Sequence, residues 1–307
     1  MAADAGVIET GPPIRRARLR LSGFFWRRPW LRALGLLALP LAAFLVVYVG
    51  SLGVLLISSL WTSNSFTSTI EHTWTLANYR TIFSRAGPYL HIAGFTLEMA
   101  AVVTLTCAVL AFPLAFFMAR LAGRRTRALL FVMVLLPLWS SYLVRLYAWQ
   151  TILAHKGAIN WALNGLGLPD QNLAYTNTAM WIVYTYVWLP FMVLPVYAAL
   201  ERIPESYLEA SGDLGARGWR TFRSVVLPLA LPGVVAGSIF TFALTLGDFI
   251  TPILIGGAGS SFIGNVIYSN VGVAGNLPFA AALAIVPIVI MGIYLAAARA
   301  VGAFEAV

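Results

Sequence analysis

The sequence is short of charged residues, cysteine, histidine and lysine, and each shortage excludes a class of protein. Only 10% of the 307 residues are charged, whereas a soluble domain carries about a quarter, so a water-soluble globule is excluded. The single cysteine, Cys107, excludes an intramolecular disulfide and an iron–sulfur cluster. The three histidines, His72, His91 and His155, form no HExxH pattern, so a zinc peptidase has no support. The single lysine, Lys156, follows histidine rather than glycine, and the chain therefore has no P-loop for ATP.

Apolar residues fill the sequence in long runs. Hydrophobic residues make up 60% of the chain, and its mean hydropathy is +0.83. Six runs are long enough to cross about 30 Å of hydrocarbon at about 1.5 Å per residue. The predicted spans are Ala33–Leu60, Ile92–Met118, Ala128–Ile152, Ala179–Leu200, Pro228–Ile255 and Pro278–Ala298. The sequence therefore predicts an all-α membrane protein with six transmembrane helices over residues 33–307, preceded by an Arg-rich tail over residues 1–32.

The formal net charge of +9 is distributed unevenly among the loops. The tail, the 119–127 loop, the 201–227 loop and the C-terminal end together carry 16 arginines. The alternate loops carry only Arg80, Arg85 and Lys156. Because basic loops are retained in the cytoplasm, both termini and the 201–227 loop are predicted to face the cytoplasm. Nucleic acid is not an expected partner, since no soluble basic domain is present to bind it.

The 201–227 loop, ERIPESYLEASGDLGARGWRTFRSVVL, is too polar to span a membrane. Pro204 suits the first turn of a helix, and Glu205 and Glu209 lie four residues apart on one face of it. Gly215 permits a tight turn before a second, Arg-rich amphipathic stretch. Helices that lie on a membrane surface usually present a basic face, whereas this one opens with acidic residues. The loop is therefore predicted to be a short helix–turn–helix that docks into another protein.

This loop resembles the EAA loop of ABC-importer permeases. The matching residues, at the spacing of that motif, are Glu209, Ala210, Ser211, Gly215, Val225, Leu227 and Pro228. Ser211 stands where a second alanine is usual, a small-for-small difference. The resemblance implies a type I importer permease fold and a coupling helix that fits a groove on a separate ATP-binding subunit. ATP and Mg²⁺ would be bound by that partner, and this chain would itself bind no cofactor and catalyse no reaction.

Further segments resemble the spermidine/putrescine permease group. They are Trp74–Phe83, Phe112–Arg120, Leu136–Asn160, Trp188–Leu200 and Leu246–Gly257. The resemblance implies a multi-pass protein of a bacterial inner membrane, in contact with lipid. Its expected partners are an ATPase dimer, a second and different permease, an extracytoplasmic binding protein and a small cationic substrate.

Other readings remain open at this point. Related permeases import ferric ion, an opine or a phosphonate and share the loop. An ion-coupled secondary transporter often shows duplicated halves, which are not visible here. An intramembrane enzyme would need a nucleophile or a set of metal ligands beside its carboxylates.

Three charged residues lie within or near predicted spans, namely Glu98, Arg145 and Asp248. Charges at that depth are costly, so they are candidates for function. Two interpretations stand side by side: Arg145 forms a structural ion pair with Asp248 or Glu98, or a carboxylate faces the translocation cavity and attracts a cation. Trp139 and Tyr142, with Trp149 further along, are predicted to share one helical face, where aromatic rings would suit a polyamine through cation–π contacts.

Overall fold

The computed structural model describes residues 29–64, 67, 69–257 and 259–300. By its internal contacts the chain divides into two units, Met1–Ile57 and Ser58–Val307. The predicted Arg-rich tail, residues 1–32, lies outside the described residues except for residues 29–32, which belong to the first described helix.

The first unit contains one long apolar helix where the first span is predicted. Helix α2 (Pro29–Phe44) continues through a π-helical turn, η1 (Leu45–Val49), into α3 (Gly50–Ser58). Residues Gly35–Ser58 are long and apolar enough to cross a membrane. Side chains exposed all around the helix suit a lipid environment.

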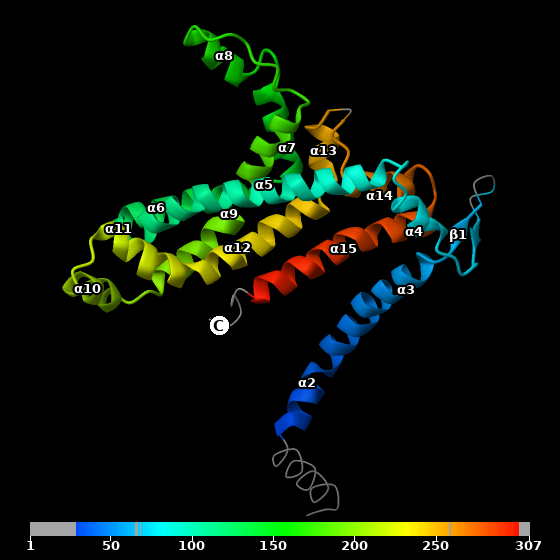
Figure 1. Ribbon diagram of the computed structural model, residues 1–307, viewed down its shortest axis with the longest axis horizontal. Helices are drawn as coiled ribbons and strands as arrows, with labels where there is room; N and C mark the ends of the chain where they lie inside the picture. The colour runs from blue at the N-terminus through cyan, green and yellow to red at the C-terminus, as the bar shows by residue number, and fades with distance from the viewer. Residues whose placement is uncertain (1–28, 65–66, 68, 258, 301–307) are drawn as a thin grey trace, which may run out of the picture. The chain divides into compact units, whose positions relative to one another are not determined.

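The second unit holds the remaining elements (Figure 1). A two-stranded antiparallel hairpin pairs β1 (Thr62–Ser63) with β2 (Ile70–Glu71). The helices are α4 (Ala77–Ile82), α5 (Tyr89–Phe116), α6 (Arg124–Leu135), α7 (Tyr142–Leu153), α8 (Ala158–Gly165), α9 (Asn177–Glu201), α10 (Glu205–Asp213), α11 (Gly218–Thr221), α12 (Leu227–Gly247), α13 (Ile250–Leu254), α14 (Ile263–Gly272) and α15 (Leu277–Ala300). Three short segments, η2 (Phe117–Leu121), η3 (Leu136–Trp139) and η4 (Phe222–Val226), extend or connect these helices.

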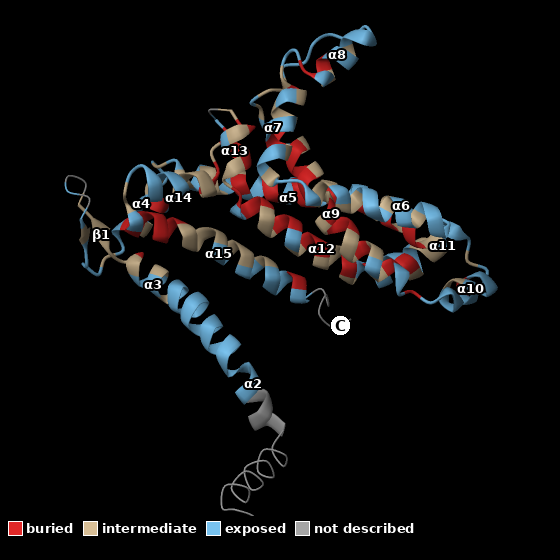
Figure 2. Cartoon of the chain, turned by 180° about the vertical axis from the view of Figure 1, so that it is seen from behind, coloured by how far each residue is buried: buried red, intermediate tan, exposed pale blue. Residues whose placement is uncertain are grey.

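The core of the second unit lies among α5, α9 and α12, which pack against one another. Figure 2 shows buried residues along the facing sides of these helices. Apolar side chains of small and medium size fill the contact, including Val103 and Cys107 of α5 and Val183, Met192 and Val196 of α9. Helix α15 packs against α12 and α14.

Among the described residues, five helices are long and apolar enough to cross a membrane, and a sixth span is present if one sharply bent pair is counted as one. The spans predicted around residues 33–60, 92–118, 179–200 and 278–298 are confirmed as continuous helices. The span predicted over residues 128–152 is not continuous, because its two helical parts, Arg124–Trp139 and Tyr142–Gly165, meet at 97°.

The bend in the third span has a local cause. Pro137 lies in the tight η3 turn, where its ring cannot donate a backbone hydrogen bond. Ser140 and Ser141 then adopt extended ψ angles of 151° and 140°. The Ser140 amide and hydroxyl both donate to the carbonyl of Pro137, at 3.3 Å and 2.8 Å, and so hold the chain at the bend.

The fifth predicted span, 228–255, is displaced along the sequence. The helix begins earlier, at Gly218, and runs through α11, η4 and α12 to Gly247. Asp248 leaves the helix with ψ of 138°, and the apolar residues that follow it form the separate short helix α13. Asp248 therefore lies at a helix end and not within a span.

Glycines allow α12 to approach α9 closely. Gly233 and Gly237 lie four residues apart, the spacing at which small residues bring membrane helices together. A Cβ atom on Gly237 would lie 2.6 Å from Sδ and 3.0 Å from Cα of Met192. A Cβ atom on Gly233 would collide with Cβ of Ala199 and with the carbonyl of Pro195.

We expect Gly237→Leu to destabilise the chain, because the extra side chain must push α9 away from α12. Overpacking of this kind costs about 1–3 kcal/mol. The matched control is Gly292→Leu in α15, since nothing lies within 4 Å of a Cβ atom there. The thermal aggregation temperature of the detergent-purified chain should fall for Gly237→Leu alone, and equal temperatures for both variants would contradict the close contact.

Candidate functional site

The predicted helix–turn–helix is present at one end of the second unit. Helix α10 ends in a Schellman motif, in which the amide of Ala216 donates to the carbonyl of Ser211 at 3.0 Å and the amide of Gly215 donates to that of Gly212 at 2.8 Å. Gly215 has φ of +76°, a left-handed conformation that favours glycine. The turn thus depends on Gly215 and reverses the chain into α11.

The EAA-like residues fall into two places. Glu209 and Ala210 are exposed on α10, whereas Ser211 is buried and its hydroxyl lies 3.0 Å from that of Thr221 in α11. This hydrogen bond ties the two short helices together. Leu227 and Pro228 lie apart from them, in the first turn of α12.

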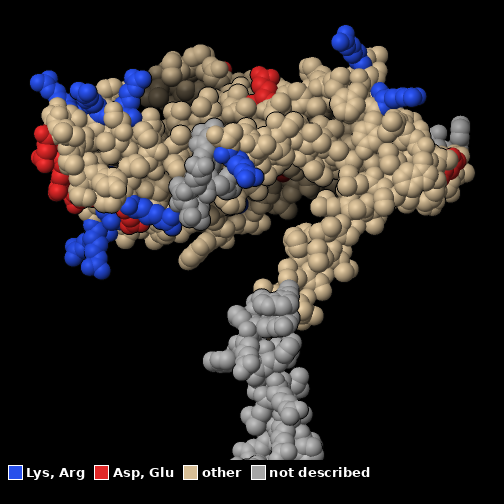
Figure 3. Space-filling view, turned by 60° about the horizontal axis from the view of Figure 1, so that its bottom comes forward, with Lys and Arg blue, Asp and Glu red and all other residues tan. Residues whose placement is uncertain are grey.

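Large apolar side chains are exposed at this end of the molecule. The exposed fractions are 53% for Tyr207, 88% for Leu214 and 72% for Trp219. Acidic and basic side chains gather at the same end (left in Figure 3). We define the coupling surface as Glu205, Tyr207, Glu209, Leu214 and Trp219. Exposed apolar side chains within a charged rim are typical of a protein interface.

Arg120 holds the start of this loop to the helical bundle. Its Nη2 atom donates to the carbonyl oxygens of Leu200 at 2.7 Å and of Ile203 at 2.6 Å. Leu200 lies in the last turn of α9 and Ile203 just beyond it, where no further helical turn follows, and the Arg120 guanidinium adds a charged donor to both carbonyls. Arg127 adds a longer ion pair with Glu201, at 3.8 Å.

The contacts of Arg120 were not predicted from the sequence, in which it is one of the arginines of the 119–127 loop. A signal was present, because an arginine ends an otherwise apolar run in the segment Phe112–Arg120.

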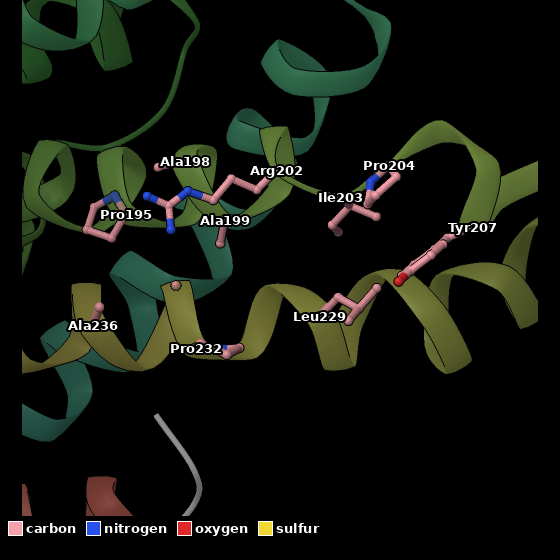
Figure 4. A pocket seen from close by; sticks show the side chains of 11 residues that line it. Pro195, Ala198, Ala199, Arg202, Ile203, Pro204, Tyr207, Leu229, Pro232 and Ala236 are labelled. Atoms are coloured by element: carbon pink, nitrogen blue, oxygen red, sulfur yellow. The ribbon is translucent and has the colours of Figure 1, made fainter. Parts of the chain in front are cut away.

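An open hollow of about 380 Å³ separates the loop from α12 on the other side (Figure 4). Pro195 and Arg202 of α9 line it from one side, and Leu229 and Pro232 of α12 line it from the other. In Figure 4 the Arg202 side chain lies back along α9 toward Pro195. The loop is therefore held chiefly on the side where Arg120 lies.

At the opposite end of α12, Asp248 lies in a buried polar group. Its Oδ2 accepts hydrogen bonds from the Tyr142 hydroxyl at 2.5 Å and the Thr251 amide at 3.2 Å, and its Oδ1 accepts from the Ile250 amide at 3.0 Å. Tyr142 and Thr251 also share a hydrogen bond of 2.6 Å between their hydroxyls. We call Tyr142, Asp248 and Thr251 the outer cluster. Asp248 caps α13 in the manner of an N-cap side chain.

The ion pair predicted for Arg145 is not formed with either carboxylate. The ion pairs between described residues join Arg127 to Glu201 and His155 to Asp170. The Arg145 guanidinium carbon instead lies 5.8 Å from the ring centre of Tyr142, at cation–π distance. Two of its nitrogens, Nε and Nη1, are buried without a hydrogen-bond partner among the described residues.

The predicted aromatic face is also not formed, because the 97° bend separates Trp139 from Tyr142. Trp139 is 90% exposed, whereas Tyr142 stacks on Trp188 of α9 with ring centres 5.7 Å apart. Trp149 packs edge-on against Tyr186. Glu98 lies in a separate hollow between α5 and the start of α9. Of the five predicted pathway residues, the structure thus brings together Asp248, Tyr142 and Arg145.

Comparison with known proteins places this architecture in a family. Residues 111–303 match the family described as the binding-protein-dependent transport system inner membrane component. The inner membrane ABC transporter permease protein YdcU of Escherichia coli is 47% identical over 307 residues, covering 96% of this chain and 97% of that protein. The spermidine/putrescine transport system permease protein PotB of Escherichia coli is 33% identical over 257 residues, covering 83% of this chain and 92% of that protein.

A solved structure shares the fold. The crystal structure of a bacterial alginate ABC transporter, in complex with an alginate pentasaccharide-bound periplasmic protein, contains a chain with a TM-score of 0.72 and 19% sequence identity. The match covers 91% of this chain and 96% of that one.

The chain belongs to the family of binding-protein-dependent transport system inner membrane components. It is a multi-pass inner membrane protein with the type I fold, and it is the permease subunit of an ABC importer. ATP hydrolysis in such a transporter is the task of a separate ATPase subunit, which accords with the lack of a P-loop in this sequence.

We expect Arg120→Ala to loosen residues 202–215, because the carbonyls of Leu200 and Ile203 lose a charged donor. Such hydrogen bonds contribute about 1.5–3 kcal/mol, so amide hydrogen exchange in the loop should accelerate about ten-fold or more. Arg124→Ala is the control, since Arg124 is an exposed arginine in the next helix. Unchanged exchange in Arg120→Ala would show that the loop is held by other contacts.

Proposed function

We propose that this chain is the permease of an ABC importer for polyamines such as spermidine or putrescine. The observation that carries the proposal is the 33% identity to a spermidine/putrescine permease over 83% of this chain, together with the resemblance of Leu136–Asn160 and Leu246–Gly257 to that group. The membrane part also supplies what a flexible dication requires, namely carboxylates and aromatic rings near one end of the bundle.

We further propose that the coupling surface docks on the ATPase. The exposed apolar side chains of Leu214 and Trp219 would be buried by a docked partner. The acidic Glu205 and Glu209 beside them would set the orientation of docking. This surface and both chain termini would face the cytoplasm, as the distribution of arginines indicates. An extracytoplasmic binding protein would deliver the substrate to the opposite end.

The connections of the coupling surface support a mechanism for transmitting motion. Arg120 joins the loop to both α5 and α9, and α11 continues without interruption into α12. A displacement of α10 by the closing ATPases therefore moves α9 and α12 together. With a second, different permease forming the other half, such motion would expose a shared cavity to each side of the membrane in turn.

The left-handed turn at Gly215 should be essential for coupling. We expect Gly215→Val to lower substrate-stimulated ATP hydrolysis and ATPase copurification several-fold, because a β-branched residue opposes positive φ. Gly215→Asn is the matched variant, since asparagine tolerates that conformation, and it should retain most of both activities. Equal coupling by both variants at equal expression would show that the conformation of the turn is unimportant.

Substrate-stimulated hydrolysis tests the polyamine proposal. The transporter should be copurified from native membranes with its partners, reconstituted, and assayed with a panel of spermidine, putrescine, an opine, a phosphonate and ferric ion. We expect stimulation and uptake with a polyamine and not with the other solutes, because cavity carboxylates attract organic cations. Stimulation by another solute alone would replace the polyamine assignment and leave the family assignment intact.

A further inference from the structure

Asp248 and Glu98, the two carboxylates among the predicted pathway residues, differ in how many hydrogen bonds they accept from this chain. Both oxygens of Asp248 accept hydrogen bonds, and the residue is 9% exposed. The Glu98 side chain is exposed and makes no ion pair or hydrogen bond with any described residue. The Asp248 carboxylate is therefore occupied by hydrogen bonds that hold α7 and α13, whereas the Glu98 carboxylate is available to a ligand.

Glu98 lies on a face of α5 that is otherwise apolar. Leu97 and Val102 beside it are 40% and 43% exposed, and Leu105 two turns on is 67% exposed. The residue is nine positions into a helix that begins at Tyr89, about 14 Å along its axis. A carboxylate at that depth is costly against lipid, so this face borders a water-filled cavity or another subunit.

The surroundings of Glu98 form a hollow of about 270 Å³, close to the lower size of small-ligand sites. Phe95 of α5 and Trp181 of α9 supply aromatic rings, and Asn177 and Thr178 supply polar groups from the first turn of α9. The Trp181 indole nitrogen donates to the Thr106 hydroxyl at 3.0 Å, which fixes the orientation of the ring. The N-terminal end of α9 carries partial positive charge that offsets the cost of the carboxylate.

We infer that the Glu98 hollow, and not Asp248, binds one ammonium group of the transported polyamine at the outer end of the pathway. The Glu98 carboxylate provides the counter-charge, and the Trp181 and Phe95 rings contact the cation and the adjoining methylenes. This inference rests on the proposed polyamine function, and it makes Glu98 the residue that selects cationic substrates.

The open hollow and the fixed indole ring suit a mobile dication, and a basic side chain of the second permease at the same place is the alternative that the experiment below separates. The open volume beside Glu98 and the fixed indole ring form a preorganised site that a ligand can enter and leave.

The test uses the complete reconstituted transporter with Glu98→Gln, Glu98→Asp and the control Glu71→Gln, which removes a carboxylate from the β2 strand. Uptake of putrescine and of N-acetylputrescine, which has one ammonium group fewer, is measured over a range of concentrations. We expect Glu98→Gln to raise the KM for both amines about ten-fold or more with the maximal rates retained, because the ammonium group that each of them carries loses its counter-charge. Glu98→Asp should keep most of the affinity for both amines, and Glu71→Gln all of it.

Three results would overturn the inference. Wild-type KM values in Glu98→Gln would remove Glu98 from substrate binding. Loss of the second permease on purification of Glu98→Gln would show a pairing role instead, as would lower maximal rates with unchanged KM values. If the wild-type transporter takes up neither amine, the polyamine function itself fails, and that outcome is distinguishable because it requires no variant.

Discussion

The close contact between α9 and α12 is the interaction on which the rest of the second unit depends. Gly233 and Gly237 let the two backbones approach to a distance that side chains would forbid. In hydrocarbon the hydrophobic effect does not drive helices together, so such close van der Waals packing has to stabilise the bundle. Because α9 ends at the loop and α12 ends at Asp248, this one contact relates the coupling surface to the outer cluster.

Much of the fold follows from the sequence because apolar length is a one-dimensional signal. Four predicted spans coincide with continuous helices to within a few residues. The third did not, because Pro137 within an apolar run has the same hydropathy whether the helix continues or turns by 97°. The fifth ended too late because the residues after Asp248 are apolar, although the aspartate itself caps a new helix.

The candidate site was predictable only where its residues are close in sequence. The spacing from Glu209 to Gly215 identifies α10 and its turn, since helix and cap are local structures. Arg120 contacts carbonyls 80 and 83 residues away, and Tyr142 reaches Asp248 across 106 residues. No periodicity encodes such pairs. The Arg145 ion pair was wrong because Arg145 lies three residues after Tyr142 on α7, where its guanidinium contacts the Tyr142 ring instead of a carboxylate.

The length of the continuous helix formed by α5 and η2, Tyr89–Leu121, affects how a soluble partner can reach the 201–227 loop. Its 33 residues measure about 50 Å along the axis, whereas the hydrocarbon layer is about 30 Å thick. Roughly 20 Å of helix must therefore project beyond the acyl chains, minus what tilt absorbs. Arg120 lies near one end of this helix, so length that projects there holds the loop beyond the lipid headgroups. A soluble partner that docks on the loop would then not have to displace headgroup water or deform the bilayer.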